Sequence, residues 1–386
     1  MIKKEIGISV YPETQELDFC KKKIDDAVAL GYTKIFTGFG SDLENIKLTD
    51  KFIEVFKYAK EKGLEFHVDF NNYVMKGLGM TCDNLKLAAD IGIPVIRVDC
   101  GISHEDIITM TKNPYGIKIE ENLSNINILK DKMEKVKKYG NMDNYCACHN
   151  FYPRINSGLD IEYAFECARI AKSYGCKTGA FIGSLYSEPA LVANGKSTMT
   201  VEKHRYIPSH IQAMELFSSE LFDFLIFGDG DPSYEEMVAV SQTTKNAYEC
   251  LSQEEKEKLN EDQRKEYENA YCIQLPIYFE NFENPSIEKL KSIVMKNRID
   301  ICEEAVRIMN WRGTYSVNAK NTIKRPKYSV TIDNKYNDGY RGEIEILLKD
   351  MPAVPYANVI GMVKPYAYDL VDIIRKGKVM FKFSEY

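Results

Sequence analysis

The first part of the chain alternates eight short apolar runs with segments of helical period. The runs are rich in β-branched and aromatic residues, and the segments between them place apolar side chains three to four positions apart. Eight such pairs over about 240 residues match the size of a (β/α)8 barrel, which we therefore predict. The expected strands cover residues 5–11, 34–39, 65–70, 95–100, 117–124, 145–152, 177–183 and 222–229.

The composition of the runs also indicates a parallel sheet. Most of them are apolar throughout, as in a parallel sheet covered on both faces, although IKIEENLS at 117–124 departs from this pattern. Ser233 is followed three residues later by Glu236, a capping-box spacing that predicts a last barrel helix extending to about residue 250. Among the other expected barrel helices are those at residues 16–30, 50–62, 126–139, 160–174 and 203–219.

The composition of the sequence changes after the eighth run. Residues 251–270 are highly charged and predict a solvated helix that links two domains. From residue 271 onward, short strands separated by turn signals such as Asp338-Gly339, with one long helix near 286–309, predict a small, mostly antiparallel β-barrel. The expected division is therefore a (β/α)8 barrel at 1–250, a charged helical linker at 251–270 and a β domain at 271–386.

Composition narrows the class of protein. The chain of 386 residues is 44% hydrophobic and 28% charged, an ordinary globular mixture, and its net charge of -6 is spread along the chain without a basic patch for nucleic acid. No run approaches the roughly 18 apolar residues that span a bilayer, and the N-terminal apolar run is too short for a signal peptide. Its 10 cysteines are scattered, which favours reduced thiols. We expect a cytoplasmic protein that binds neither nucleic acid nor membrane.

Polar residues follow the predicted strands at their C-terminal ends, where (β/α)8 barrels carry their catalytic groups. One such residue often only caps a helix or bonds a loop amide, but this many around one barrel mouth predict a site. The residues are Tyr11 and Glu13 after the first strand, Asp69 and Asn71 after the third, Asp99 after the fourth, Asn122 and Ser124 after the fifth, His149, Asn150, Tyr152 and Arg154 after the sixth, and Asp229 after the eighth.

The sixth run, YCACHNFYPR, resembles a metal site because it contains Cys146, Cys148 and His149. In a strand, residues two apart share a face, so the two cysteines point one way and His149 the other. This divergence argues against both a zinc site and a Cys-His nucleophile. Arg154 offers a planar fork suited to phosphate or carboxylate.

A second polar cluster follows the seventh strand. Glu202, His204 and Arg205 stand where a helix is expected to begin, and helix N-termini favour anions. The alternative is that Glu202 complements the helix dipole while His204 and Arg205 are surface residues. Together with Arg154, the cluster favours an anionic substrate.

Several motifs together resemble the 6-phospho-N-acetylmuramidase family. They are GISVYPE, VDC, CHNFYPR with SGL, TVEKHR, FGD, and TIDN followed by YRGEIEI, and they are spread over nearly the whole chain. The resemblance implies an N-terminal (β/α)8 barrel and a C-terminal cyclophilin-like β-barrel. It also implies a cytosolic glycosidase that cleaves N-acetylmuramic acid 6-phosphate linked to N-acetylglucosamine in peptidoglycan recycling, and we expect no metal or other cofactor.

Some positions depart from the family's pattern. Before the His-Arg pair the family usually reads Pro-Thr-Leu-Glu, whereas this chain has Met199-Thr200-Val201-Glu202 after an extended loop at 186–198. The family's TGL is SGL here, and GDGDP at 228–232 is longer than the family's turn. These departures leave open a different sugar or aglycone.

Glycoside cleavage generally uses two carboxyl groups, one of which protonates the leaving oxygen. The candidates are Asp69, Asp99, Glu202 and Asp229. Neighbouring strands lie about 4.8 Å apart, so Asp69 and Asp99 are the expected catalytic pair, and which of them is the acid stays open. The substrate's acetamido group offers a further route, in which one Asp orients that group. The expected substrate-binding residues are Glu13, Asn71, Asn122, Ser124, His149, Asn150, Tyr152, Arg154, His204 and Arg205.

Two other functions remain open. A metal-dependent sugar-phosphate isomerase or epimerase would use Asp99, His149 and Glu202 around a divalent cation. A carbohydrate-binding or structural protein would need no catalytic carboxyl group. The C-terminal domain is expected to be a lid or an interaction module, with Tyr340, Arg341 and Glu343 either reaching the barrel mouth or forming a structural hairpin. A homodimer is also left open.

Overall fold

The computed structural model describes residues 3–38, 49–99, 101–187, 197–280, 289–309, 312–313 and 316–385. The chain divides into two compact units, one at residues 2–244 and one at residues 245–386. No helix in the described ranges is long and apolar enough to cross a membrane.

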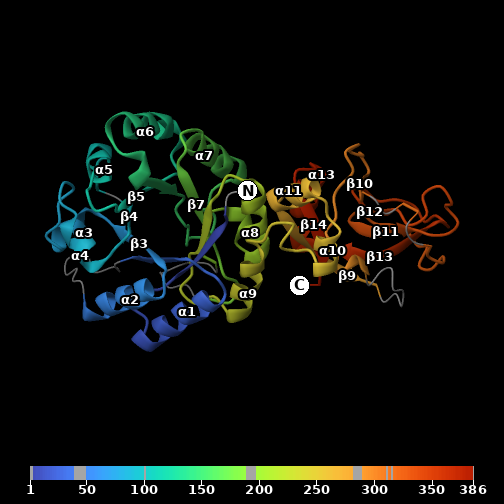
Figure 1. The fold of residues 1–386 in the computed structure, drawn as a ribbon, viewed down its shortest axis with the longest axis horizontal. Helices are drawn as coiled ribbons and strands as arrows, with labels where there is room; N and C mark the ends of the chain where they lie inside the picture. Colours follow the sequence, from blue (N-terminus) through green and yellow to red (C-terminus); the bar gives the residue numbers. More distant parts are fainter. Residues whose placement is uncertain are drawn as a thin grey trace. The chain divides into compact units, whose positions relative to one another are not determined.

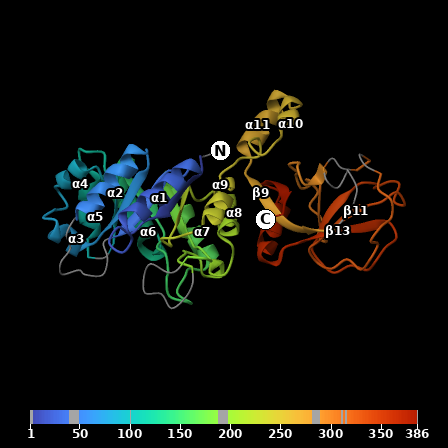
Figure 2. The same ribbon diagram turned by 90° about the horizontal axis from the view of Figure 1, so that it is seen from below.

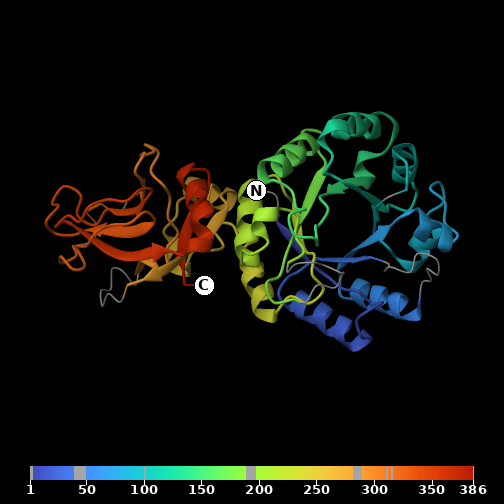
Figure 3. The ribbon, with the colours of Figure 1, turned by 180° about the vertical axis from the view of Figure 1, so that it is seen from behind.

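The first unit is a closed barrel of eight parallel strands in sequence order, which confirms the predicted (β/α)8 fold (Figures 1 and 3). Register pairs such as Glu5 with Phe224 join the last strand to the first and close the barrel. The strands are β1 Glu5–Ser9, β2 Lys34–Gly38, β3 Glu65–Phe70, β4 Val95–Val98, β5 Lys118–Asn122, β6 Tyr145–Cys148, β7 Lys177–Ile182 and β8 Phe224–Phe227. Phe39 and Cys100, at the ends of two predicted strands, lie outside the described residues.

Helices surround the strands (Figure 1), and each turns a small or apolar face toward the barrel, as α7 does with its buried Ala164, Cys167, Ala168 and Ala171. They are α1 Leu17–Ala29, α2 Asp50–Glu61, α3 Asn72–Gly77, α4 Lys86–Ile91, α5 His104–Thr111, α6 Ile126–Tyr139, α7 Ile161–Ser173, α8 Ser209–Ser218 and α9 Tyr234–Gln242. The capping box of Ser233 and Glu236 is confirmed, but α9 ends at Gln242 rather than near residue 250. The helix expected at 203–219 is interrupted at Pro208, so that a short 3-10 turn at Glu202–His204 precedes α8.

The second unit begins with the charged run at 251–270, which forms two short helices instead of one (Figure 2). They are α10 Gln253–Glu257 and α11 Glu261–Asn269, and each starts with its own capping box, because Ser252 and Asn260 both bond the backbone of the following turn. Leu259 and Tyr267 pack against a core that contains Cys272 and Met380. The run is therefore a packed part of the second unit.

Six strands form one curled half-barrel sheet in the order β10-β12-β11-β13-β9-β14. Its pairs are antiparallel except for β9 with β14, so the expected β structure is confirmed. The strands are β9 Cys272–Phe279, β10 Ala305–Arg307, β11 Ser329–Asp333, β12 Ile344–Leu347, β13 Ala357–Val363 and β14 Met380–Ser384.

The long helix predicted near 286–309 is wrong from Lys291 onward, and residues 286–288 lie outside the described part. Met295 instead exchanges backbone hydrogen bonds with Phe381, and β10 follows. Pairing with the sheet has outweighed the local helical pattern. The second unit also contains α13 Tyr368–Arg375, a helix that the sequence analysis did not predict.

Candidate functional site

The barrel mouth brings together side chains from three neighbouring strands. Asp69 on β3 is the register partner of Arg97 on β4, which in turn is the register partner of Glu120 on β5. Arg97 Nη1 donates to Asp69 Oδ1 at 3.2 Å, and Arg97 Nη2 donates to the side-chain oxygen of Asn150. Arg97 is buried and thus ties the end of β3 to the loop after β6.

Asp69 is a partly exposed carboxyl group at the C-terminal end of β3. Its side chain is 23% exposed, so a ligand in the barrel mouth can reach it. Burial raises its pKa to about 6; the charge of Arg97 opposes this rise and the charge of Asp99 adds to it. A carboxyl group with this pKa carries a proton in much of the population near pH 6.

Asp99 lies on the neighbouring strand end and is exposed. Its backbone N–H donates to the carbonyl of Phe70 at 2.9 Å, which keeps the ends of β3 and β4 side by side. Since the charge of Asp99 affects Asp69, the two predicted catalytic carboxyl groups are brought together at one place.

Aromatic rings form a cluster in the barrel core. Phe36, Phe151 and Phe181 pack edge to face, with ring centroids 5.0 to 5.8 Å apart, and Tyr11 joins them. The Arg97 guanidinium lies 5.9 Å from the Phe181 ring centroid. The cluster therefore contributes to the burial of Arg97, the residue that pairs with Asp69.

Glu202 and Arg205 bind each other and the neighbouring loop. Arg205 donates from Nε and Nη2 to the two oxygens of Glu202 at 2.7 Å. Nη2 also donates to the carbonyls of Tyr152 and Arg154, and Nη1 donates to the carbonyl of Ser197. The Arg205 side chain is 1% exposed. The predicted role of Arg205 in holding an anion therefore does not fit its position.

Glu202 also accepts hydrogen bonds from the backbone of the neighbouring loop. Its carboxylate accepts from the backbone N–H groups of Asn156 and Gly158 at 2.9 and 2.7 Å. The hydrogen bonds from Arg205 hold its pKa down at about 2. A carboxyl group that stays ionised and accepts four hydrogen bonds cannot serve as a general acid, so Glu202 shapes the loop at 152–158 instead.

The two predicted histidines are also engaged away from the mouth. His149 is buried, with Nδ1 at 2.8 Å from Ser124 Oγ and Nε2 at 3.1 Å from the carbonyl of Ala164 on α7, and burial lowers its pKa to about 4. His204 is buried against Glu215, with Nε2 at 2.8 Å from Oε2. Both positions favour packing roles over substrate binding.

Three further predicted residues bond the backbone. Asn71 caps α3 by accepting from Val74 N at 2.9 Å, and Asn122 accepts from Ser124 N at 2.9 Å. Asp229 is fully buried and accepts through Oδ2 from Ser184 N and Thr198 N, while its Oδ1 has no hydrogen-bond partner among the described residues. Burial raises its pKa. Without exposure, Asp229 organises the segment after β7.

Glu13, Tyr152 and Arg154 remain accessible at the mouth. Glu13 and Arg154 are exposed, and Tyr152 is half-buried with a pKa that burial raises. The Arg154 carbonyl accepts from Arg205, which fixes the backbone that carries this arginine. Of the cations predicted to bind an anion, Arg154 is the one whose guanidinium is exposed.

The predicted split of the sixth strand is confirmed. Cys146 and Cys148 are buried on the interior side, where Cys146 Sγ lies 3.9 Å from Glu120 Oε2, whereas His149 faces α7. Burial raises the pKa of both thiols well above the usual range. Asp99, His149 and Glu202, the ligands of the isomerase hypothesis, each contact different groups, and within the described ranges no three His, Cys, Asp or Glu side chains are placed to hold one ion.

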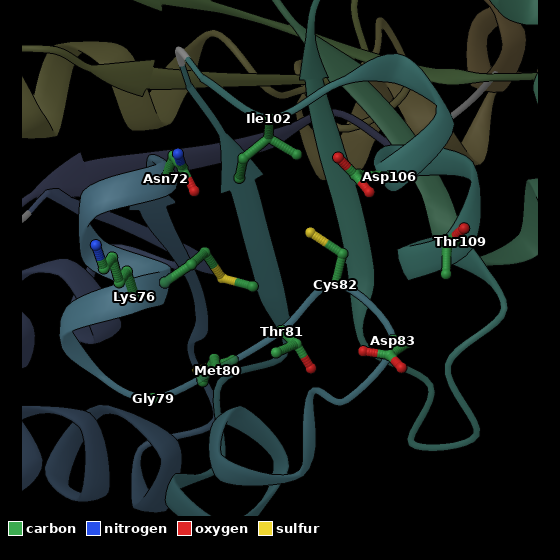
Figure 4. Close-up of a pocket in the computed structure, with 11 residues that line it drawn as sticks. Asn72, Lys76, Gly79, Met80, Thr81, Cys82, Asp83, Ile102, Asp106 and Thr109 are labelled. Atoms are coloured by element: carbon green, nitrogen blue, oxygen red, sulfur yellow. The ribbon is translucent and has the colours of Figure 1, made fainter.

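A pocket of about 620 Å³ opens between α3 and α5 (Figure 4). Met75, Met80 and Ile102 contribute apolar surface, while Lys76 and Asp106 carry charge. The pocket contains none of the predicted site residues. Asn72 lines the pocket, and it directly follows Asn71, the residue that caps α3 after the end of β3.

Arg97 was missed by the sequence analysis, although the sequence contains a signal for it. A charged residue inside the apolar run VIRVDC must either face the barrel interior or find a buried partner. Strand alternation places Arg97 on the same face as Asp99, and Asp69 on the same face as His67. That periodicity would have identified Arg97 as a neighbour of the catalytic pair.

Comparisons with known proteins assign both units to the same family. The profile described as 6-phospho-N-acetylmuramidase, N-terminal, matches residues 6–242, and the corresponding C-terminal profile matches residues 273–384. The chain is similar to the crystal structure of an uncharacterized B. cereus protein, with 27% identity, a TM-score of 0.82, and coverage of 99% of this chain and 100% of that one.

A second solved structure shows the same fold. It is a conserved protein of unknown function from Enterococcus faecalis, with 22% identity, a TM-score of 0.71, and coverage of 98% of this chain and 96% of that one. No curated protein matches the chain at a significant level.

Proposed function

Because the chain belongs to the 6-phospho-N-acetylmuramidase family, we propose that it is a glycoside hydrolase that cleaves N-acetylmuramic acid 6-phosphate from N-acetylglucosamine. The observation that carries this proposal is Asp69, a reachable carboxyl group with a pKa near 6 that Arg97 holds beside Asp99. We further propose that the enzyme acts in the cytoplasm in cell-wall recycling.

In the proposed reaction Asp69 is the general acid. It donates its proton to the glycosidic oxygen as the bond to the muramic sugar breaks, so that N-acetylglucosamine leaves as a neutral alcohol. Asp99 supplies the second carboxylate on the adjacent strand end. Adjacent strands favour the short carboxyl separation, about 5 to 5.5 Å, at which the second group attacks the sugar carbon and forms a glycosyl-enzyme. Water, which gives a proton to the now ionised Asp69, then displaces Asp99 from that carbon, so that the sugar is released with its configuration retained.

The test is incubation with the phosphorylated disaccharide and with its unphosphorylated form, followed by product analysis with and without a chelator. We expect the phosphorylated form to be split into its two sugars at a rate that the chelator does not change. A sugar-phosphate isomerase would leave the glycosidic bond intact. Equal cleavage of both forms, or of neither, would contradict phosphate recognition.

Arg154 is proposed to bind the 6-phosphate, because its guanidinium is exposed on a backbone that Arg205 holds. Replacing it by Ala should lower kcat/KM for the phosphorylated substrate about ten- to a hundredfold, the loss of one charge-assisted contact. Cleavage of the unphosphorylated form should change little. Arg169→Ala, at an exposed position on α7, is the matched control. If R154A lowers both rates equally, Arg154 acts on something other than phosphate.

A further inference from the structure

Charged side chains continue from Asp69 down into the barrel. Arg97 Nε lies 3.2 Å from Glu120 Oε1 in ion-pair contact, without the alignment of a hydrogen bond. Glu120 Oε2 lies 2.8 Å from His67 Nδ1, and His67 Nε2 lies 3.2 Å from Glu65 Oε1. We call Asp69, Arg97, Glu120, His67 and Glu65 the interior charge row.

The middle of the interior charge row is closed to solvent. The side chains of His67 and Glu120 are each 1% exposed, and that of Arg97 is 4% exposed. Burial lowers the pKa of His67, but Glu120 and Glu65 outweigh burial and the net pKa is raised. For Glu120 the directions are reversed. Burial raises its pKa, but the neighbouring His67 and Arg97 lower it by more, so the net pKa is lowered. The row therefore holds a buried anion between two cationic partners.

This geometry has a consequence for Asp69. An unopposed guanidinium beside a carboxyl group favours its ionised form and would remove the proton that an acid catalyst needs. Glu120 faces the same guanidinium from the other side and shares its charge. Within the described residues, the Asp69 carboxyl group accepts a hydrogen bond only through Oδ1.

We propose that Glu120 is a positioning residue that acts through Arg97: it orients the guanidinium toward one oxygen of Asp69 and balances its charge, so that Asp69 keeps its proton. The role of this proton in cleavage rests on the proposed function. The positioning itself does not, because it is a property of the interior charge row.

Several groups face the members of this row. Asp69 is faced by Arg97 and Asp99 from β4 and by Glu120 from β5, and its charge also reaches Tyr11. The groups that face Glu120 are His67 from β3, Lys34 from β2, Arg97 from β4, and the Cys146 and Cys148 thiols from β6. Of these, Arg97 alone contacts both carboxyl groups.

The test compares Glu120→Gln with Glu121→Gln. Glu121 is the next residue on β5, is also buried, and points outward, where it accepts from Tyr145 Oη at 2.7 Å and pairs with Lys132. In E120Q, Arg97 acts on Asp69 without its counter-charge, so the Asp69 titration should move to lower pH by about one unit or more. In E121Q it should stay where it is in the wild-type protein.

The titration is followed by ¹³C NMR of the aspartate carboxyl carbons, with the Asp69 signal assigned by its loss in Asp69→Asn. This measurement needs no substrate, so a failure of the proposed cleavage leaves it intact. An unshifted Asp69 in E120Q, or an equal shift in E121Q, overturns the inference. Should E120Q not fold, Arg97→Lys keeps the charge but loses the fork that joins Asp69, Asn150 and Glu120. We then expect the same NMR measurement to show the Asp69 titration moved from its wild-type position, and an unmoved Asp69 titration in R97K overturns the inference.

Discussion

Replacing Asp69 by Asn should lower kcat for the phosphorylated disaccharide by about 10² to 10⁴-fold, the usual contribution of a general acid. Asn keeps the size of the side chain and an oxygen for Arg97 Nη1, but it has no acidic proton to give to the leaving sugar. KM should change little, because the loss falls on the transition state. Steady-state kinetics on the disaccharide measure both quantities.

The specific sign of lost acid catalysis is a dependence on the leaving group. D69N should retain most of its kcat/KM for an aryl glycoside, because the phenol leaves without protonation in the first step. Asp231→Asn is the control, since Asp231 is exposed after β8 and pairs with Lys23 at 2.6 Å. Asp69 is not the acid if D69N cleaves the disaccharide within a few-fold of the wild-type rate. The same conclusion follows if kcat/KM falls equally for the disaccharide and the aryl glycoside.

The pH dependence of kcat/KM for the wild-type enzyme should also show that Asp69 is the acid. The pKa of Asp69 is raised to about 6, so its protonated form persists up to that pH and is lost above it. For an acid catalyst, kcat/KM then falls about tenfold per pH unit above pH 6. If the acid had the ordinary pKa of aspartate, kcat/KM would begin to fall near pH 4 instead.

Replacing Glu202 by Ala should lower the free energy of unfolding by about 3 kcal/mol, as expected when a buried arginine loses its partner. The Arg205 side chain is 1% exposed, and the Glu202 side chain retains 29% exposure, which places the loss at the lower end for such pairs. Urea unfolding curves measure the change. Asp90→Ala is the control, because Asp90 belongs to an exposed pair with Lys86 whose loss should cost less than about 0.5 kcal/mol.

The stabilisation by Glu202 should also depend on pH. Its pKa is lowered from 4.5 to about 2, so its contribution is fully present above pH 4.5 and disappears as the pH falls toward 2. The unfolding free energies of wild type and Glu202→Gln should therefore converge over that range. An E202A midpoint equal to that of the wild type, or a difference that persists at pH 2, would show that the Glu202–Arg205 pair does not stabilise the fold.

These expectations differ from what the motif TVEKHR predicted alone. His204 and Arg205 were expected to bind an anionic substrate, and Glu202 was a candidate catalytic carboxyl group. Arg205 instead binds Glu202 and three backbone carbonyls, and His204 binds Glu215. A motif can be specific to a family because it builds a loop. Here that loop carries Arg154, so the motif serves phosphate recognition indirectly in the proposed function.

Much of the barrel could be predicted because its signals are local. Apolar runs, helical period and the Ser233 capping box depend on residues a few positions apart, and strand alternation correctly separated Cys146 and Cys148 from His149. The helix expected near 286–309 failed for the opposite reason. Met295 pairs with Phe381, far along the chain, and a local pattern does not register such a partner.

The sequence by itself determined the order of the eight barrel strands and placed Asp69 and Asp99 at adjacent strand ends. Only the tertiary structure decided which polar groups remain available at the mouth, because a buried charge must find a partner and that partner comes from another strand or loop. Arg205, His149 and Asp229 are bound by distant backbone or side-chain groups. Asp69 keeps a partly exposed carboxyl group, and burial among the ends of neighbouring strands raises its pKa.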